Sequence, residues 1–395
     1  MRRKVDVPAR IVKPHIRSRA GAAGAAFAAR LRGSEAGRGG IFPPAFEWRG
    51  GAPLERESSW IEAAQGLADA LGRGEVCRVE ARGLSDAERG WSGAEVVRGE
   101  AVLSDGSRMP LILKCAERKE RCAMARLTRQ RQCVPASFSA DLDGAAPAWM
   151  AMEDLGRQRL APPDDRAFLR RFAIALASIH ARDLDRGTEM PWLPAAGADH
   201  WRRVVSELSV DHFERKLHES ESFARAFGRY LAPLREMGAR FAREMTARCE
   251  EAACMTLTHG DLQMRDGAHV YDCTGAPRII DFGFCGYAPL YIDLAGWFSD
   301  ADLPLYHAAL AAQGIVLRYA DFEERARAAR RYNGFVYLCP SVMDWRDGPT
   351  ERTGMRLLQA LKIILDGDFP ERAVRYSPAL FQRLLAEFGA ADTAE

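Results

Sequence analysis

The sequence predicts an α+β protein of two lobes, in which a small antiparallel β lobe precedes a larger helical lobe. Three observations support this prediction. Strand-type segments cluster between residues 75 and 115, helical periodicity dominates from residue 164 onwards, and the chain has 395 residues. Because single cores tend to divide beyond roughly 250 to 300 residues, we expect an N-terminal lobe over 51–155 and a helical lobe over 156–395.

The first 50 residues form a basic extension. They contain eleven Lys or Arg and three acidic residues, so the remainder of a chain with formal charge +2 carries −6. Such a tail could bind nucleic acid or direct the chain to an organelle. Its Arg- and Ala-rich composition also suits a disordered extension, which is the interpretation we adopt for 1–50.

Composition excludes several classes of protein. No apolar run reaches the roughly 20 residues that span a bilayer. The nine cysteines contain no Cys-x-x-Cys and follow no repeating interval, so neither a zinc site nor a disulfide framework is predicted. We expect a cytoplasmic protein with no membrane or nucleic-acid partner.

The β lobe begins after a helical segment at 60–71. Three strand-type segments follow, at 75–84, 94–103 and 110–115. A polar loop that contains glycine joins the first two, and an Asp-Gly turn joins the second to the third. This pattern predicts an antiparallel meander.

Lys114 stands in the middle of the apolar segment Leu-Ile-Leu-Lys-Cys. A lysine in a strand can extend its stem to solvent, or it can pair with an anion. The next segment, 117–130, has the spacing of an amphipathic helix and places Glu120 within reach of Lys114. An apolar strand at 148–156 follows, and it ends in acidic residues and a glycine.

Two acidic motifs lie later in the chain, Thr-His-Gly-Asp at 258–261 and Ile-Ile-Asp-Phe-Gly at 279–283. Between them, the segments 268–272 and 277–281 have strand character and are separated by a turn that contains glycine. A hairpin therefore joins the two motifs. Because a hairpin returns the chain beside its starting point, acidic residues on both sides of it can approach one another.

The acidic residues concerned are Asp261, Asp266 and Asp281. Neighbouring carboxylates repel one another unless a cation lies between them. Mg²⁺ prefers oxygen ligands and binds through one or two carboxylates plus the phosphates of a substrate. The spacing therefore predicts a magnesium and phosphate site, with Lys114 as the basic partner of the phosphates.

These landmarks, in this order, resemble the aminoglycoside phosphotransferase and choline kinase-like family, which shares the protein kinase fold. The resemblance covers roughly residues 75–300, and His180 and Asp293 match further landmarks of the family. It implies a small-molecule kinase that uses ATP and Mg²⁺ to phosphorylate a hydroxyl group.

Residue by residue, the resemblance implies that Asp261 is the catalytic carboxylate and that Asp281 and Asp266 bind the metal. Lys114 would hold the α and β phosphates, with Glu120 fixing its side chain. The remaining roles concern the nucleotide and the catalytic turn. Backbone groups of Glu153 and Leu155 would contact adenine, those around Gly90, Ser92 and Gly93 would cover the phosphates, and His259 would stabilise the turn.

One departure from the family pattern concerns Asp266, which stands where the family has Asn. Aspartate can still bind Mg²⁺, but it adds a negative charge opposite the triphosphate. A catalytically weakened pseudokinase that acts as a nucleotide-binding or interaction module is therefore the alternative hypothesis. A protein kinase is disfavoured, because no Ala-Pro-Glu-like activation segment follows Asp-Phe-Gly.

The acceptor implied by the resemblance is an aminoglycoside-like compound, an amino alcohol or a sugar. Aromatic faces near acidic residues suit a cationic acceptor, but they suit an ordinary core equally well. The candidates in the helical lobe are Trp201, Trp297, Asp300, Asp302, Tyr332, Tyr337, Asp344 and Trp345.

Overall fold

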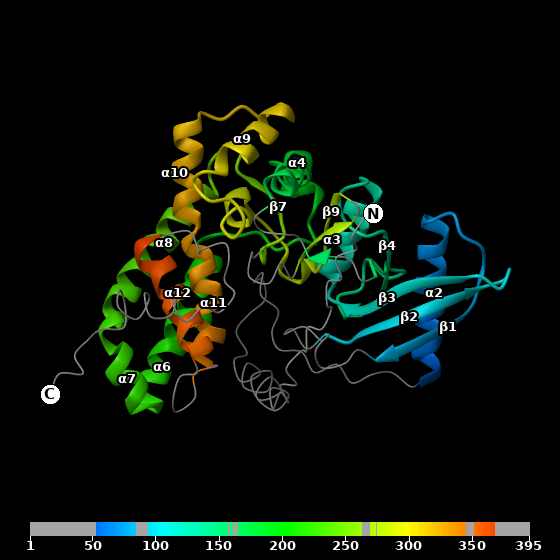
Figure 1. The fold of residues 1–395 in the computed structure, drawn as a ribbon, viewed down its shortest axis with the longest axis horizontal. Coiled ribbons are helices and arrows are strands. Elements are labelled where there is room, and N and C mark those ends of the chain that lie inside the picture. The colour runs from blue at the N-terminus through cyan, green and yellow to red at the C-terminus, as the bar shows by residue number, and fades with distance from the viewer. Residues whose placement is uncertain are drawn as a thin grey trace, which may run out of the picture.

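In a computed structural model, the chain is an α+β protein in which a five-stranded antiparallel sheet precedes a region dominated by helices (Figure 1). This arrangement confirms the predicted fold class. The predicted extension over 1–50 lies outside the residues that the structure describes. Those residues are 53–83, 94–156, 159–160, 165–262, 269–273, 275–343, 345 and 351–367.

The sheet has the strand order β1-β2-β3-β5-β4, and all neighbouring strands are antiparallel. The four strands predicted from the sequence are present as β1, β2, β3 and β5. In the turn between β2 and β3, Gly106 has a φ of 85°, a conformation that favours glycine after Asp105. The strands are β1 (Val76–Gly83), β2 (Val96–Leu103), β3 (Arg108–Ala116), β4 (Ser137–Phe138) and β5 (Ala148–Glu153).

Side chains along β3 alternate between the two faces of the sheet. Leu111 and Leu113 pack in a cluster with helix α2 (Pro53–Ala70), which begins upstream of the predicted start at residue 60. Ile112 packs on the other face, against the core of the helical region. Lys114 shares the face of Ile112, so it points toward the helices.

Helix α3 (Arg118–Arg129) confirms the helix predicted at 117–130. Its polar residue Arg121 is completely buried, beneath the loop that precedes β5. The Arg121 guanidinium donates hydrogen bonds to four backbone carbonyls, which satisfies its charge in the interior. These carbonyls belong to Ala116, Asp141, Gly144 and Ala146.

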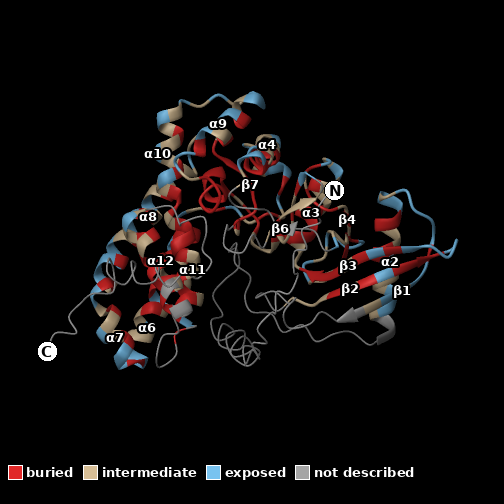
Figure 2. Cartoon of the chain, viewed as in Figure 1, coloured by how far each residue is buried: buried red, intermediate tan, exposed pale blue. Residues whose placement is uncertain are grey.

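The helical region begins with α4, whose N-cap Asp165 accepts hydrogen bonds from the backbone N–H groups of Ala167 and Phe168. A continuous apolar cluster joins this region to α3, and its buried residues are red in Figure 2. The candidate acceptor residues Trp201 and Trp297 are fully buried in that cluster, which favours core packing over acceptor binding. The helices are α4 (Arg166–Asp183), α5 (Ala198–Val205), α6 (Asp211–Glu219), α7 (Glu221–Phe227), α8 (Leu231–Arg248), α9 (Leu303–Ala312), α10 (Tyr319–Ala329), α11 (Arg331–Met343) and α12 (Glu351–Asp366).

Short strands lie between α8 and α9. Strand β7 (Met255–Thr258) pairs with β10 (Gly286–Pro289), and β8 (Val270–Cys273) pairs with β9 (Ala276–Ile279). The β8-β9 pair confirms the predicted hairpin. β7 ends directly before the His-Gly-Asp motif and β9 ends just before the Asp-Phe-Gly motif, so both motifs begin at strand ends. In the described part of the chain, no helix has the length and apolar character needed to cross a membrane.

The contact between α11 and α12 yields a prediction about stability. A Cβ atom added at Gly334 would lie 2.6 Å from Cγ1 of Ile364 and 3.0 Å from the carbonyl oxygen of Ala360. Although alanine favours helix more than glycine does, we expect this overpacking to dominate in Gly334→Ala. The free energy of unfolding should fall by about 1 to 3 kcal/mol in urea denaturation.

Gly228 provides the matched control, since it has a helical φ of −55° and an added Cβ would meet no atom within 4 Å. Gly228→Ala should leave stability unchanged or raise it by up to about 1 kcal/mol. Equal stability of the two variants would contradict the close packing of α11 on α12.

Candidate active site

Lys114 connects the sheet to both α3 and the Asp-Phe-Gly turn. Its Nζ donates to Oε1 of Glu120 at 2.6 Å and to Oδ1 of Asp281 at 2.7 Å. The side chains of Lys114 and Glu120 are 8% and 4% exposed. The lysine therefore pairs with anions inside the protein, and the alternative in which it extends to solvent is wrong.

The charges of this triad shift the pKa of each member. Burial acts to lower the pKa of Lys114, but the charges of Asp281 and Glu120 outweigh burial and raise it. Burial acts to raise the pKa of Asp281, but Lys114 and then His269 hold it well below its usual range. Burial raises the pKa of Glu120 despite its contact with Lys114. Lys114 thus stays protonated and Asp281 stays ionised.

The His-Gly-Asp turn follows β7 and is shaped by His259 and Gly260. Nδ1 of His259 accepts the backbone N–H of Asp261 at 3.1 Å, so its Nε2 donates to the carbonyl of Ile280 at 2.8 Å. Gly260 has a φ of 79°, and a Cβ there would lie 2.4 Å from the carbonyl oxygen of Phe284. His259 therefore ties this turn to the end of the β8-β9 hairpin, and glycine is required beside it.

Asp293 also stabilises the His-Gly-Asp turn. Its two carboxylate oxygens accept the backbone N–H groups of His259 at 2.7 Å and Gly260 at 2.8 Å. Nε2 of His180 donates to Asp293 at 3.1 Å, and Nδ1 of His180 is 2.7 Å from the Tyr306 hydroxyl. The two family landmarks noted in the sequence therefore contact each other and anchor the His-Gly-Asp turn.

Asp281 lies in a left-handed conformation, with φ 67° and ψ 61°, immediately before the 3₁₀ turn Phe282–Phe284. This conformation is uncommon for a residue other than glycine and costs free energy, so the surrounding contacts must hold it. The ion pair with Lys114 and the burial of Phe282 against the His259 ring supply those contacts. The Asp281 carboxylate is thereby directed toward Lys114.

Asp261 is held by two side chains outside its own turn. The hydroxyl of Tyr337 donates to Oδ1 of Asp261, and Nε2 of His269 lies 3.3 Å from Oδ2. Tyr332, also on α11, donates to the carbonyl of Gly260 at 2.8 Å. Two tyrosines of α11 therefore contact the His-Gly-Asp turn, and one of them bonds to the Asp261 carboxylate.

His269 lies between Asp261 and Asp281, with Nδ1 3.8 Å from Oδ2 of Asp281. Burial acts to lower the pKa of His269, but its contact with Asp261 and the charge of Asp281 outweigh burial and raise it. The sequence predicts no role for this residue, because a lone histidine carries no motif. Its position directly before β8 is the one signal that marks it.

The remaining predicted residues fall into two groups, those near the end of β5 and those outside the described residues. Glu153 ends β5 and donates its backbone N–H to Ala136, and Leu155 follows in the segment that leaves the sheet. Glu153 and Leu155 therefore lie at the end of β5 and in the segment directly after it. Five predicted residues lie outside the described ranges, namely Gly90, Ser92, Gly93, Asp266 and the acceptor candidate Asp344.

The described residues fit a metal ion that arrives with a nucleotide. Among them, no group of three or more His, Cys, Asp or Glu side chains is arranged to hold a metal by itself. A nucleotide-bound cation needs fewer protein ligands, because the phosphates supply the others. Asp281 suits this role, since Lys114 contacts its Oδ1 whereas its Oδ2 faces His269 across a gap wider than a hydrogen bond.

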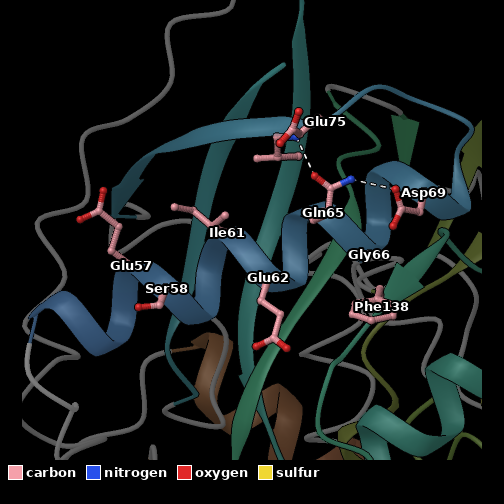
Figure 3. A pocket seen from close by; sticks show the side chains of 10 residues that line it. Glu57, Ser58, Ile61, Glu62, Gln65, Gly66, Asp69, Glu75 and Phe138 are labelled. Atoms are coloured by element: carbon pink, nitrogen blue, oxygen red, sulfur yellow. Dashed lines mark hydrogen bonds between the residues drawn. The ribbon is translucent and has the colours of Figure 1, made fainter. Parts of the chain in front are cut away.

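A separate hollow lies between α2 and the start of β1 (Figure 3). It is on the α2 face of the sheet, opposite the face that carries Lys114. In it, Gln65 donates to Asp69 and accepts the backbone N–H of Val76. Its lining includes four acidic residues and no basic one, so it does not suit phosphates. These acidic residues are Glu57, Glu62, Asp69 and Glu75.

The sheet with its buried Lys114-Glu120 pair, and the helical region with its His-Gly-Asp and Asp-Phe-Gly turns, define a protein of the protein kinase-like class. A comparison with family models then identifies the group within that class. The model of the phosphotransferase enzyme family matches residues 101–330, and the chain belongs to this family. No curated protein sequence matches the chain significantly.

Solved structures of similar fold include the spectinomycin phosphotransferase APH(9)-Ia in complex with ADP and spectinomycin. It is 11% identical, with a TM-score of 0.46 over 79% of this chain and 94% of that one. Choline kinase LicA from Streptococcus pneumoniae is 11% identical, with a TM-score of 0.45 over 80% and 100%. Choline kinase from Cryptosporidium parvum Iowa II is 11% identical, with a TM-score of 0.49 over 76% and 94%.

The support of the His-Gly-Asp turn by Asp293 can be tested with Asp293→Asn. An amide offers one oxygen where the carboxylate offers two, so its NH₂ group would face a backbone N–H donor in a site that is 1% exposed. We expect the free energy of unfolding to fall by about 2 to 4 kcal/mol in chemical denaturation.

Asp199→Asn is the matched control, because Asp199 is 84% exposed and pairs with Arg202 on the surface of α5. This change should alter stability by less than about 0.5 kcal/mol. If both variants were equally stable, the turn would not depend on Asp293.

Proposed function

We propose that the protein transfers the γ-phosphoryl group of ATP to a hydroxyl group of a small molecule. The observation that carries the proposal is the Lys114 ammonium, bonded to Glu120 and Asp281, in a member of the phosphotransferase enzyme family. His269 lies between Asp281 of this group and the Asp261 carboxylate. Phosphoryl transfer depends chiefly on positioning and on stabilising negative charge, and these residues offer a fixed cation beside two carboxylates.

On the nucleotide side, Lys114 binds the α and β phosphates while Glu120 keeps its side chain in place. Asp281 would hold Mg²⁺, which would supply positive charge to the phosphates of the bound nucleotide. Backbone groups of Glu153 and Leu155 bind adenine. From the sequence alone we also assign Gly90, Ser92 and Gly93 to the phosphates and Asp266 to the metal.

On the acceptor side, Asp261 orients the acceptor hydroxyl and takes its proton. The bond from the Tyr337 hydroxyl supports this role, since it shows that a hydroxyl donor can reach Oδ1 of Asp261. The formal charge of −6 beyond residue 50 favours a cationic acceptor. We therefore propose an aminoglycoside-like compound or an amino alcohol as acceptor, with sugars as the neutral class.

Asp261→Asn tests the catalytic assignment. An amide cannot take the proton of the acceptor, so ADP release across a panel of aminoglycosides, amino alcohols and sugars should fall about 10²- to 10⁴-fold. Binding of ADP, measured by calorimetry, should persist. Asp143→Asn, a change at a fully exposed carboxylate in the loop before β5, should retain full turnover.

Two results would refute the proposal. Full turnover of Asp261→Asn would show that this carboxylate is not catalytic. If the wild-type protein binds ADP with magnesium but forms no ADP from ATP with any acceptor, it is a nucleotide-binding module and not a kinase.

Lys114→Met tests the nucleotide site. Hydrogen bonds to charged groups contribute roughly 1.5 to 3 kcal/mol, so we expect ADP to bind about 10- to 100-fold more weakly in calorimetry. Lys216→Met, on α6, should bind ADP as the wild type does. Unchanged affinity in Lys114→Met would place the phosphates elsewhere.

A further inference from the structure

His269 is a buried imidazole whose two nitrogens face two different carboxylates. Nε2 is 3.3 Å from Oδ2 of Asp261, and Nδ1 is 3.8 Å from Oδ2 of Asp281. Its side chain is 15% exposed. Within the described residues, the buried Nδ1 atom has no hydrogen-bond partner. An orphaned nitrogen in such a place calls for an explanation.

The hydrogen-bonding capacity of the ring indicates what is missing beside Nδ1. A carboxylate only accepts, so Nε2 of His269 must donate to Asp261, and in the neutral ring Nδ1 then carries a lone pair. This lone pair faces Oδ2 of Asp281, which is another acceptor. Two buried acceptors that face each other repel, whereas a proton on Nδ1, or a metal ion in its place, satisfies both.

Among the described residues, the neighbouring side chains of His259 and Lys114 do not fill this gap. The ring of His259 is 5.4 Å away between centroids, and both of its nitrogens are used by the backbone of Asp261 and Ile280. Lys114 donates to the other oxygen of Asp281, Oδ1, and to Glu120. The edge formed by Nδ1 of His269 and Oδ2 of Asp281 is therefore distinct from the lysine contact.

We propose that Nδ1 of His269 and Oδ2 of Asp281 bind the same divalent cation, so that the metal site has a nitrogen ligand as well as oxygen ligands. The proposal rests on the proposed function, because the phosphates of a nucleotide complete the coordination. A histidine that binds metal usually donates its other ring N–H to a carboxylate, and His269 has such a partner in Asp261. The histidine thereby joins the metal to the catalytic carboxylate.

Metal preference follows from the ligand types. Carboxylate and phosphate oxygens suit Mg²⁺, whereas imidazole suits transition metals. We expect the protein to bind Mn²⁺ or Co²⁺ together with ADP more tightly than Mg²⁺, and His269 to account for the difference. In His269→Asn, which has an amide in place of the imidazole, the ratio of Mn²⁺ to Mg²⁺ affinity should fall at least tenfold.

The decisive experiment is pulsed electron paramagnetic resonance of the full chain with Mn²⁺ and ADP. The wild type should show the ¹⁴N modulation of a directly bound imidazole, and labelling with ¹⁵N-histidine should change that modulation. His269→Ala and His269→Asn should both lose it. His218→Ala, a change at an exposed histidine on α6, should keep it.

The outcomes separate this inference from the proposed function. If the wild type binds Mn²⁺ with ADP but shows no histidine nitrogen, or if His269→Asn retains the modulation, the inference is wrong and the phosphotransferase proposal stands. If the modulation depends on His269 but no acceptor leads to ADP release from ATP, the inference holds and the proposed function fails. Absence of Mn²⁺ binding would overturn the inference.

Discussion

The ion triad of Lys114, Glu120 and Asp281 is the interaction on which the arrangement of the site depends. One ammonium joins carboxylates from a helix and a turn to a strand of the sheet, with bonds of 2.6 and 2.7 Å. Removing one member of such a buried group leaves an uncompensated charge, which costs several kcal/mol. The sheet, α3 and the Asp-Phe-Gly turn are therefore confined to one relative position, and that position brings Asp281 and Asp261 to opposite sides of His269.

Backbone contacts then hold the two acidic turns against each other. The His259 ring bonds to the backbone of Asp261 and of Ile280, one in each turn. Asp293 accepts two N–H groups of the His-Gly-Asp turn, and Gly260 approaches the carbonyl of Phe284. These bonds use polar groups that burial would otherwise leave unsatisfied. The carboxylates are thus oriented before any ligand arrives, which is the condition under which fixed charges act most strongly on a reaction.

Most of the fold could be predicted from the sequence, because it depends on local patterns. The apolar run at 111–115 marked Lys114 as an anomaly, helical spacing placed Glu120 near it, and turn residues indicated the hairpin between the acidic motifs. The role of His269 could not be predicted, since it arises from contacts with Asp261, which precedes it in another turn, and with Asp281, which lies across the β8-β9 hairpin. The aromatic residues of the helical region were ambiguous for a similar reason, as only packing distinguishes a core ring such as Trp201 from a binding surface.

The bonds from α11 to the His-Gly-Asp turn couple the position of this helix to the position of the Asp261 carboxylate. Tyr332 and Tyr337 lie on one helix and contact the carbonyl of Gly260 and the carboxylate of Asp261. A mutation that reshaped this helix would also displace the Asp261 carboxylate. Under the proposed function, a helix reshaped to admit a bulkier acceptor would therefore slow phosphoryl transfer, unless compensating changes in α12 restore the helix to its place.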